Sequence, residues 1–323
     1  RVTDFSYTFT NCPILKVIPT FTNNTKVTTF LETFQNCKAL TGITTNIFSG
    51  CTNVINFTST FANCSGMTLI PSDLFNSSTG VTTFANTFYN CSGLTIAPSF
   101  TYNTKVNTFA NTFYGCRTLT GITSGIFSNN PNVTTFDSTF YYCSGITSVP
   151  SNLFDACTGA TNFSNTFYYC RSMTSLPSFT YNTRAINFYY TFYNCGITGI
   201  TAGLFDTTTG VTNFNYTFYS SLITSIPSGL FNYCPLVTGF TSTFASTLIT
   251  NIPSNLFDNN VNVTTFSSTF SNCSNLATIP SNLFDFNTGV TIFNSTFQSC
   301  STLTGITAGL FNYNTKVTNC SWI

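Results

Sequence analysis

Apolar and polar positions along this chain recur with a period of 25 to 27 residues from one end to the other. The dipeptide Thr-Phe marks every period. Its phenylalanines are Phe9, Phe34, Phe61, Phe88, Phe113, Phe140, Phe167, Phe192, Phe218, Phe244, Phe270 and Phe297. Self-similarity at a fixed period of this length is typical of solenoids, in which each repeat is one supersecondary unit.

The pattern inside one unit, residues 133–154, predicts two short elements. Phe136, Phe140 and Cys143 have i, i+4, i+7 spacing, which places them on one face of a short helical turn. The segment Ile146-Thr-Ser-Val149 is rich in β-branched residues and is followed by Pro150, so it predicts a brief strand.

A unit of this size cannot bury its own apolar face, and stacking must supply the burial. We therefore expect residues 1–323 to form a single repeat solenoid of about twelve coils, with a parallel β-sheet and short helical turns. Paired strands in such a sheet would lie about 4.8 Å apart.

A longer period, of three coils, is superimposed on the first. Three coils share a shortened turn followed by a cation, and those cations are Lys26, Lys105 and Arg184. Each is 79 residues from the next. Three-coil blocks of about 79 residues were therefore duplicated through the first nine coils.

Composition changes the picture by what it excludes. Charged residues make up 5% of the chain, the net charge is +1, and there is no histidine. A histidine base, a histidine metal ligand and a Ser-His-Asp triad are ruled out. We expect a protein that is not an enzyme and has no cofactor. The lack of basic clusters argues against nucleic acid as a partner, and no apolar stretch is long enough to span a membrane as a helix.

The pattern Thr-Phe-x-x-Cys-x-x-Leu-Thr-x-Ile-Pro-x-x-Leu-Phe, followed by Asn-x-Val-Thr, resembles the BspA-like branch of leucine-rich-repeat surface proteins. It is also similar to the 25-residue repeats of bacterial surface lipoproteins. This resemblance, which covers the whole chain, implies a right-handed leucine-rich-repeat solenoid with a parallel sheet and an exposed, adhesive role. It implies no ligand, because such repeats are scaffolds.

Ten of the fourteen cysteines share one position of the repeat, which we call the cysteine ladder. They are Cys12, Cys37, Cys64, Cys91, Cys116, Cys143, Cys170, Cys195, Cys273 and Cys300. Ser221 and Thr247 replace cysteine in two coils. Since a bonding requirement would not accept a lone serine or threonine, free buried thiols are favoured over disulfides. The sequence contains no Cys-x-x-Cys pair, which argues against a zinc site. Turn formation explains the aspartates of the Leu-Phe-Asp segments better than calcium binding does.

The residue after the repeat phenylalanine is tyrosine in six consecutive coils. These tyrosines are Tyr89, Tyr114, Tyr141, Tyr168, Tyr193 and Tyr219. On the helical interpretation they point outward, and exposed aromatic residues mark interaction surfaces. They are the predicted partner-binding residues. The alternative is that they only pack on one another.

A column of threonines follows the first strand residue, at Thr41, Thr68, Thr95, Thr120, Thr147, Thr174, Thr198, Thr224, Thr250 and Thr304. Regular threonine arrays resemble ice-binding faces, but the column beside this one varies. Good exposed strand residues are the simpler explanation.

We therefore expect a non-enzymatic extracellular or cell-surface solenoid for adhesion or recognition, with a protein or carbohydrate ligand. The alternative is a self-assembling subunit of an extracellular filament, sheath or viral fibre. Residues 1–190 carry a net charge of +3 and residues 191–323 carry −2. Both ends show the same phase of the repeat, so we expect either head-to-tail self-association or flanking segments that cap the core.

Overall fold

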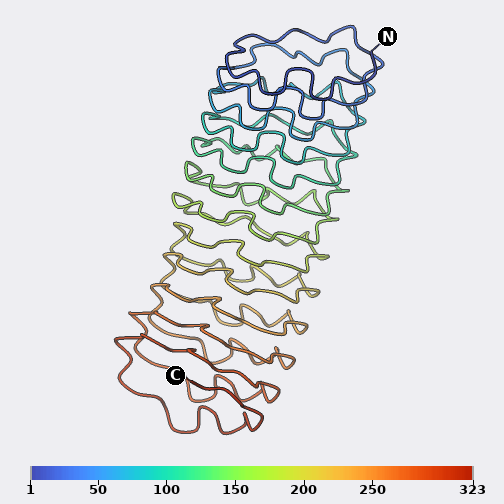
Figure 1. Ribbon diagram of the computed structural model, residues 1–323. Coiled ribbons are helices and arrows are strands. Elements are labelled where there is room, and N and C mark those ends of the chain that lie inside the picture. The colour runs from blue at the N-terminus through green and yellow to red at the C-terminus, as the bar shows by residue number, and fades with distance from the viewer. Residues whose placement is uncertain (1, 322–323) are drawn as a thin grey trace. The chain divides into compact units, whose positions relative to one another are not determined.

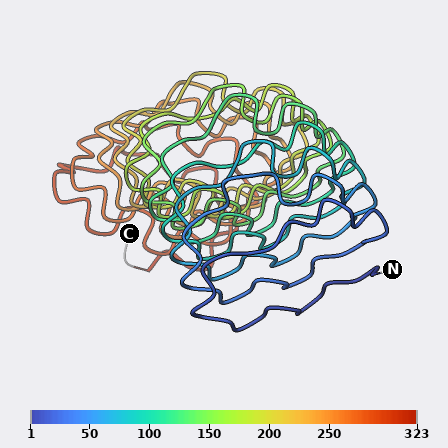
Figure 2. The ribbon, with the colours of Figure 1, turned by 90° about the horizontal axis from the view of Figure 1, so that it is seen from above.

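The computed structural model describes residues 2–321, and it divides the chain into two compact units. The first unit comprises Arg1–Ala160 and Thr166–Tyr181, and the second comprises Thr161–Asn165 and Asn182–Ile323. Within each unit, the chain runs as successive coils laid one on the next (Figure 1). Seen from above, the chain winds around an interior in successive coils (Figure 2). The buried side chains are mainly phenylalanines with other apolar residues. The fold is therefore a solenoid within each unit, and the single 1–323 domain stays a prediction.

No residue between 2 and 321 lies in a helix or in an extended strand, so there are no element bounds to give. Adjacent coils are joined instead by isolated parallel bridges at the residue just before the first phenylalanine of each repeat. In the first unit these residues are Asp4, Thr29, Asn56, Thr83, Thr108 and Thr135. In the second they are Asn162, Asn187 and Asn213, and then Gly239, Thr265, Ile292 and Asn319.

The segment that the sequence predicts as a helical turn is a ladder of alternating hydrogen bonds. In the coil of residues 109–116, the amides of Phe109, Asn111, Phe113 and Gly115 donate to carbonyls of the following coil over 2.7–3.2 Å. Between them, the amides of Thr112 and Tyr114 donate to the carbonyl three residues back in their own coil, and that of Ala110 donates to Thr108 Oγ1. The backbone is thus satisfied without a helix.

Left-handed residues make this ladder possible. Two positions in each coil, two residues after the first and second phenylalanines, have positive φ, as in Ser138 (54°) and Tyr142 (58°). Few of these residues are glycine, and a non-glycine residue costs about 1–2 kcal/mol in this conformation. Each pair of tight turns advances the chain by four residues, so Phe136 and Phe140 still lie on one face. The predicted face is therefore right, although the helical conformation is not.

From Thr33 onward the threonine of each Thr-Phe pair is buried, and in most coils its hydroxyl joins two coils. Thr139 Oγ1 lies 2.8 Å from the Phe136 carbonyl oxygen in its own coil and 2.9 Å from the Phe109 carbonyl oxygen in the coil before. Thr60, Thr87, Thr112, Thr217, Thr269 and Thr296 make the same pair of bonds. A hydroxyl donates only one proton, so the two carbonyls share it. This bond explains why threonine precedes the phenylalanine.

Three columns of phenylalanine form the core. The second phenylalanines stack nearly parallel, as Phe113 does on Phe140 at 5.5 Å between ring centroids. The phenylalanine of the Leu-Phe or Ser-Phe turn packs tilted between the first phenylalanines of two coils. Phe100 contacts Phe84 at 4.6 Å and Phe109 at 4.8 Å. All of these rings are fully buried.

The strand predicted after the cysteine ladder is weaker than expected. Among residues 2–321 it forms only the parallel bridges between Gly42 and Leu69 and between Ile96 and Gly121. The main inter-coil pairing lies elsewhere, at the residues just before the first phenylalanines.

Candidate functional site

The predicted tyrosines form a stacked, partly exposed surface in the first unit, which we call the tyrosine face (Tyr89, Tyr114, Tyr141 and Tyr168). Each side chain is half-buried. The ring centroids of consecutive coils lie 4.6, 4.5 and 4.3 Å apart, with interplanar angles of 15° or less. The exposed part of this row of rings can contact a partner.

The second unit carries its own stacked tyrosines. Tyr193 and Tyr219, both predicted, lie 4.8 Å apart at 2°. Tyr190 and Tyr216, which the sequence analysis did not single out, stack beside them at 4.5 Å. Tyr190 also contacts Tyr193 at 5.2 Å.

Two further tyrosines widen the face in the first unit. Tyr142 and Tyr169 occupy left-handed positions, with φ of 58° and 61°. Tyr142 packs edge-on against Tyr141 at 4.8 Å, and Arg171 lies over the ring of Tyr169 at 4.6 Å. This cation–π contact leaves a positive charge at the border of the aromatic surface. The sequence could have indicated both residues, because each directly follows a predicted tyrosine, Tyr141 or Tyr168.

The hydroxyls of Tyr114, Tyr141 and Tyr168 have raised pKa values and stay protonated well above neutral pH. Burial, and then the neighbouring Tyr114, raises the pKa of Tyr141 to about 12. Burial raises the pKa of Tyr114 and of Tyr168 as well. Each of these three hydroxyls therefore keeps its proton, so it can donate as well as accept a hydrogen bond under physiological conditions.

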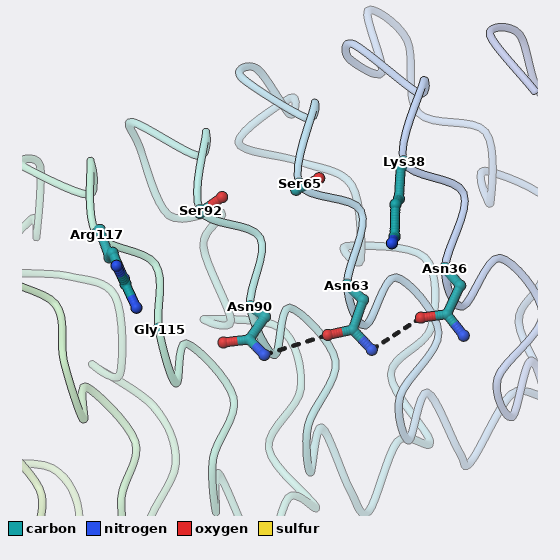
Figure 3. Close-up of a pocket in the computed structure, with 8 residues that line it drawn as sticks. All are labelled: Asn36, Lys38, Asn63, Ser65, Asn90, Ser92, Gly115 and Arg117. Carbon is teal, nitrogen blue, oxygen red and sulfur yellow. Dashed lines mark hydrogen bonds between the residues drawn. The ribbon is translucent and has the colours of Figure 1, made fainter. Parts of the chain in front are cut away.

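A second feature adjoins the tyrosine face: a shallow groove of about 650 Å³ floored by asparagine side chains, which we call the amide groove. Figure 3 shows Asn36, Asn63 and Asn90 in consecutive coils, joined by amide-to-amide hydrogen bonds. Asn63 donates from Nδ2 to Asn36 Oδ1 over 2.9 Å, and Asn90 donates to Asn63 Oδ1 over 3.2 Å. The sequence analysis missed this row, although asparagine stands two residues after the Thr-Phe phenylalanine in each of these three coils.

The walls of the amide groove are polar and carry only positive charge. Lys38 and Arg117 line it together with Ser65, Ser92 and Gly115, and no acidic side chain does. Gly115 has φ of 72°, and an added Cβ would lie 2.2 Å from Asn90 Oδ1. Arg117 also borders a pocket of about 380 Å³ with Tyr142, Tyr169 and Arg171. The amide groove and the aromatic residues therefore share one cation.

The outer threonine column is bonded within the protein. Thr68 Oγ1 donates to the Thr41 carbonyl oxygen over 3.0 Å, and Thr174 Oγ1 donates to that of Thr147 over 3.1 Å. These hydroxyl protons stabilise coil contacts, which agrees with a structural role for the column.

The ladder cysteines are free thiols, as predicted, and all except Cys12 are buried. In most of them, the Sγ atom points at the carbonyl oxygen of the second phenylalanine of the preceding coil. For Cys91, the distance from Sγ to the Phe61 carbonyl oxygen is 3.0 Å. Ser221 makes the same bond to Phe192. Among residues 2–321, no group of three or more cysteine, aspartate or glutamate side chains could hold a metal ion.

In the part of the chain that the structure describes, no helix is long and apolar enough to cross a membrane.

No family model matches the chain, and no curated protein matches it. Solved structures similar to it include leucine-rich-repeat proteins. An internalin from Listeria monocytogenes is 11% identical, with 89% of this chain and 82% of that one covered and a TM-score of 0.36. A leucine-rich-repeat protein from Bacteroides ovatus is 16% identical, with 91% and 78% covered and a TM-score of 0.38.

A chain in the Toll–Spatzle complex of Drosophila is 13% identical, with a TM-score of 0.46. The match covers 90% of this chain, which spans 42% of the length of that one.

Proposed function

We propose that this chain is a non-enzymatic recognition solenoid of an extracellular surface, and that it attaches to its partner through the tyrosine face. The observation that carries the proposal is the parallel stack from Tyr89 to Tyr168, whose rings lie 4.3–4.6 Å apart while the side chains stay partly exposed. A row of rigid aromatic side chains presents contact area at low entropic cost.

Composition supports the non-enzymatic and extracellular parts of the proposal. The chain has no histidine, the side chain that most often transfers protons in enzymes, and only eight acidic residues. The surface is solvated by threonine, serine, asparagine and tyrosine rather than by charge. The repeat motif resembles that of BspA-like surface proteins, and this resemblance supports adhesion as the biological role.

The test replaces Tyr114, Tyr141 and Tyr168 together with serine and measures attachment of the purified protein to host or bacterial cells and to a glycan array. We expect attachment to be lost while the far-UV circular dichroism and the cooperative unfolding transition remain. Loss of one aromatic contact typically weakens binding by about 1–3 kcal/mol, so three should abolish it.

The matched control replaces Tyr102 and Tyr181, which belong to the same unit and are 56% and 57% exposed. This control should attach normally. A folded triple variant that attaches as well as the parent would place the binding surface elsewhere. Continuous polymers in negative-stain images of the parent protein would instead favour the filament alternative.

A further inference from the structure

We propose that the amide groove is a binding site for an acidic oligosaccharide, whose hydroxyls pair with the asparagine amides and whose carboxylates pair with Lys38 and Arg117. The inference rests on the proposed function, because it names a ligand class for the surface that adjoins the tyrosine face.

The amides have bonding capacity left over. A side-chain amide offers two N–H donors and two oxygen lone pairs. Asn63 uses one donor on Asn36 and one lone pair for Asn90. One donor and one lone pair therefore remain on this half-buried side chain, at the floor of the groove. A sugar hydroxyl, which both donates and accepts, satisfies both at once.

The hydrogen bonds between successive asparagine amides also fix the spacing and orientation of these side chains. Asn36 and Asn63 are each held between two other amides, in a row that runs from Asn11 to Asn90 with bonds of 2.6–3.2 Å. Little rotational freedom remains to be lost on binding, and preorganised polar groups bind more tightly than mobile ones. Successive amides recur once per coil, at about 4.8 Å, which is comparable with the advance of one sugar ring in an extended chain.

The charge of the groove selects a sparsely anionic ligand. Lys38 and Arg117 are exposed and three coils apart, or about 14 Å at the usual strand spacing. Neither forms an ion pair with a described residue, and no acidic side chain lines the groove. A nucleic acid carries a phosphate on every nucleotide and is held by clustered cations. Two cations over three coils suit a polymer with a carboxylate on a few of its contacted sugars.

The end of the groove at Arg117 supplies the remaining features of a sugar site. Gly115 leaves no side chain between Asn90 and Arg117, which opens the groove toward the neighbouring pocket. That pocket is lined by Tyr142 and Tyr169. Tyrosine offers a flat apolar body and a hydroxyl, so a sugar chain in the groove would meet an aromatic platform where it leaves.

The test measures binding of a hyaluronan oligosaccharide, which carries a carboxylate on every second sugar, by calorimetry at low ionic strength, alongside the same oligosaccharide after chemical reduction of its carboxyl groups. We expect the parent protein to bind the acidic form and to bind the reduced form at least about tenfold more weakly. The variant Lys38→Gln/Arg117→Gln should lose about tenfold in affinity for the acidic form. Asn63→Ala should weaken the binding of both forms.

The chain offers a matched control in Lys26→Gln/Lys105→Gln. These two lysines are also exposed, lie in the same unit, and are separated by the same 79 residues as Lys38 and Arg117. The control variant should bind the acidic oligosaccharide as the parent does. Thermal unfolding checks that all variants keep the fold, since every charged position changed is on the surface.

Several outcomes would overturn the inference. They are equal binding of the acidic and reduced forms, equal losses in the groove variant and the control variant, no detectable binding of the acidic hyaluronan oligosaccharide, or tighter binding of a single-stranded oligonucleotide. The tyrosine triple variant separates the two proposals. If it attaches normally while Lys38→Gln/Arg117→Gln loses the oligosaccharide, the groove is a site and the tyrosine face is not.

Discussion

Cys143 lies with its Sγ atom 3.0 Å from the carbonyl oxygen of Phe113, in the preceding coil. The ladder position therefore requires a small donor that reaches this carbonyl, rather than a thiol as such. We expect Cys143→Ser to cost under about 1 kcal/mol in unfolding free energy, because the hydroxyl keeps the bond. Cys143→Val, which fills the space without a donor, should cost about 1–3 kcal/mol. Urea unfolding measures both, and equal losses would contradict the assignment.

The buried threonines can be tested with a near-isosteric change. Thr139→Val removes the hydroxyl shared by the Phe109 and Phe136 carbonyls. Each carbonyl keeps a backbone N–H donor, so we expect a loss of about 1 kcal/mol in unfolding free energy rather than the cost of an unpaired group. Thr174→Val, at an exposed threonine, should change it by less than about 0.5 kcal/mol. A neutral Thr139→Val would show that the column adds nothing to stability.

The two neighbouring aromatics Phe140 and Tyr141 should differ in their contribution to stability. Phe140 is fully buried between Phe113 and Phe167, and its replacement with alanine should cost about 3–5 kcal/mol. Tyr141 is only half-buried but stacks on two rings, so Tyr141→Ala should cost about 1–2 kcal/mol. Chemical denaturation of the two variants gives both values. A larger loss for Tyr141 would mean that the assigned inner and outer faces are reversed.

Stability should fall as the solution becomes alkaline. Burial raises the pKa of Cys143 well above its ordinary value of 9.0, and raises that of Cys157 and Cys273 to about 12. The unfolded chain therefore loses these protons first, so the stabilisation is complete below pH 9 and is lost between pH 9 and 12. Each thiol contributes a slope of about 1.4 kcal/mol per pH unit at most. Urea unfolding at pH 7, 9 and 10 measures the loss.

In the native protein at pH 8, the buried ladder thiols should also resist a thiol reagent while the exposed Cys320 reacts. Rapid modification of several cysteines under these conditions would contradict their burial.

Close backbone approach makes Gly50 irreplaceable. A Cβ at this position would lie 1.5 Å from the Thr22 carbonyl oxygen of the neighbouring coil. Because backbone atoms would have to move, Gly50→Ala should cost at least about 2 kcal/mol in unfolding free energy. Gly121→Ala is the control, since its nearest contact would be an ordinary 3.6 Å, and it should be close to neutral. Comparable midpoints for the two variants would overturn this prediction.

The repeat, the buried faces and the tyrosine row could be predicted from the sequence, because they depend on which residues recur and at what spacing. The backbone conformation could not. The i, i+4 spacing of Phe136 and Phe140 fits a helix and also fits two tight turns with left-handed residues, and Ser138 and Tyr142 are not residues from which positive φ is expected. The ladder bonds between coils stabilise that conformation, and a single repeat contains none of them.

The amide groove illustrates the same limit for the site. Asn36, Asn63 and Asn90 are visible as a recurring residue type, but a composition rich in asparagine hides them. Only the stacking of coils brings Asn63 within 2.9 Å of Asn36 and sets Lys38 and Arg117 along one groove.

The buried threonine hydroxyls also bear on how a chain of near-identical repeats avoids misalignment during folding. Rings of phenylalanine alone would stack almost as well if one coil slid along its neighbour, and such slipped alignments would be long-lived traps. The Thr139 hydroxyl reaches both carbonyls only when its own coil and the preceding one are level. In a slipped arrangement it would keep only the Phe136 carbonyl of its own coil, and the bond that joins the two coils would be lost. The threonine column thus selects one alignment at every step of assembly, independently of what it adds to the final stability.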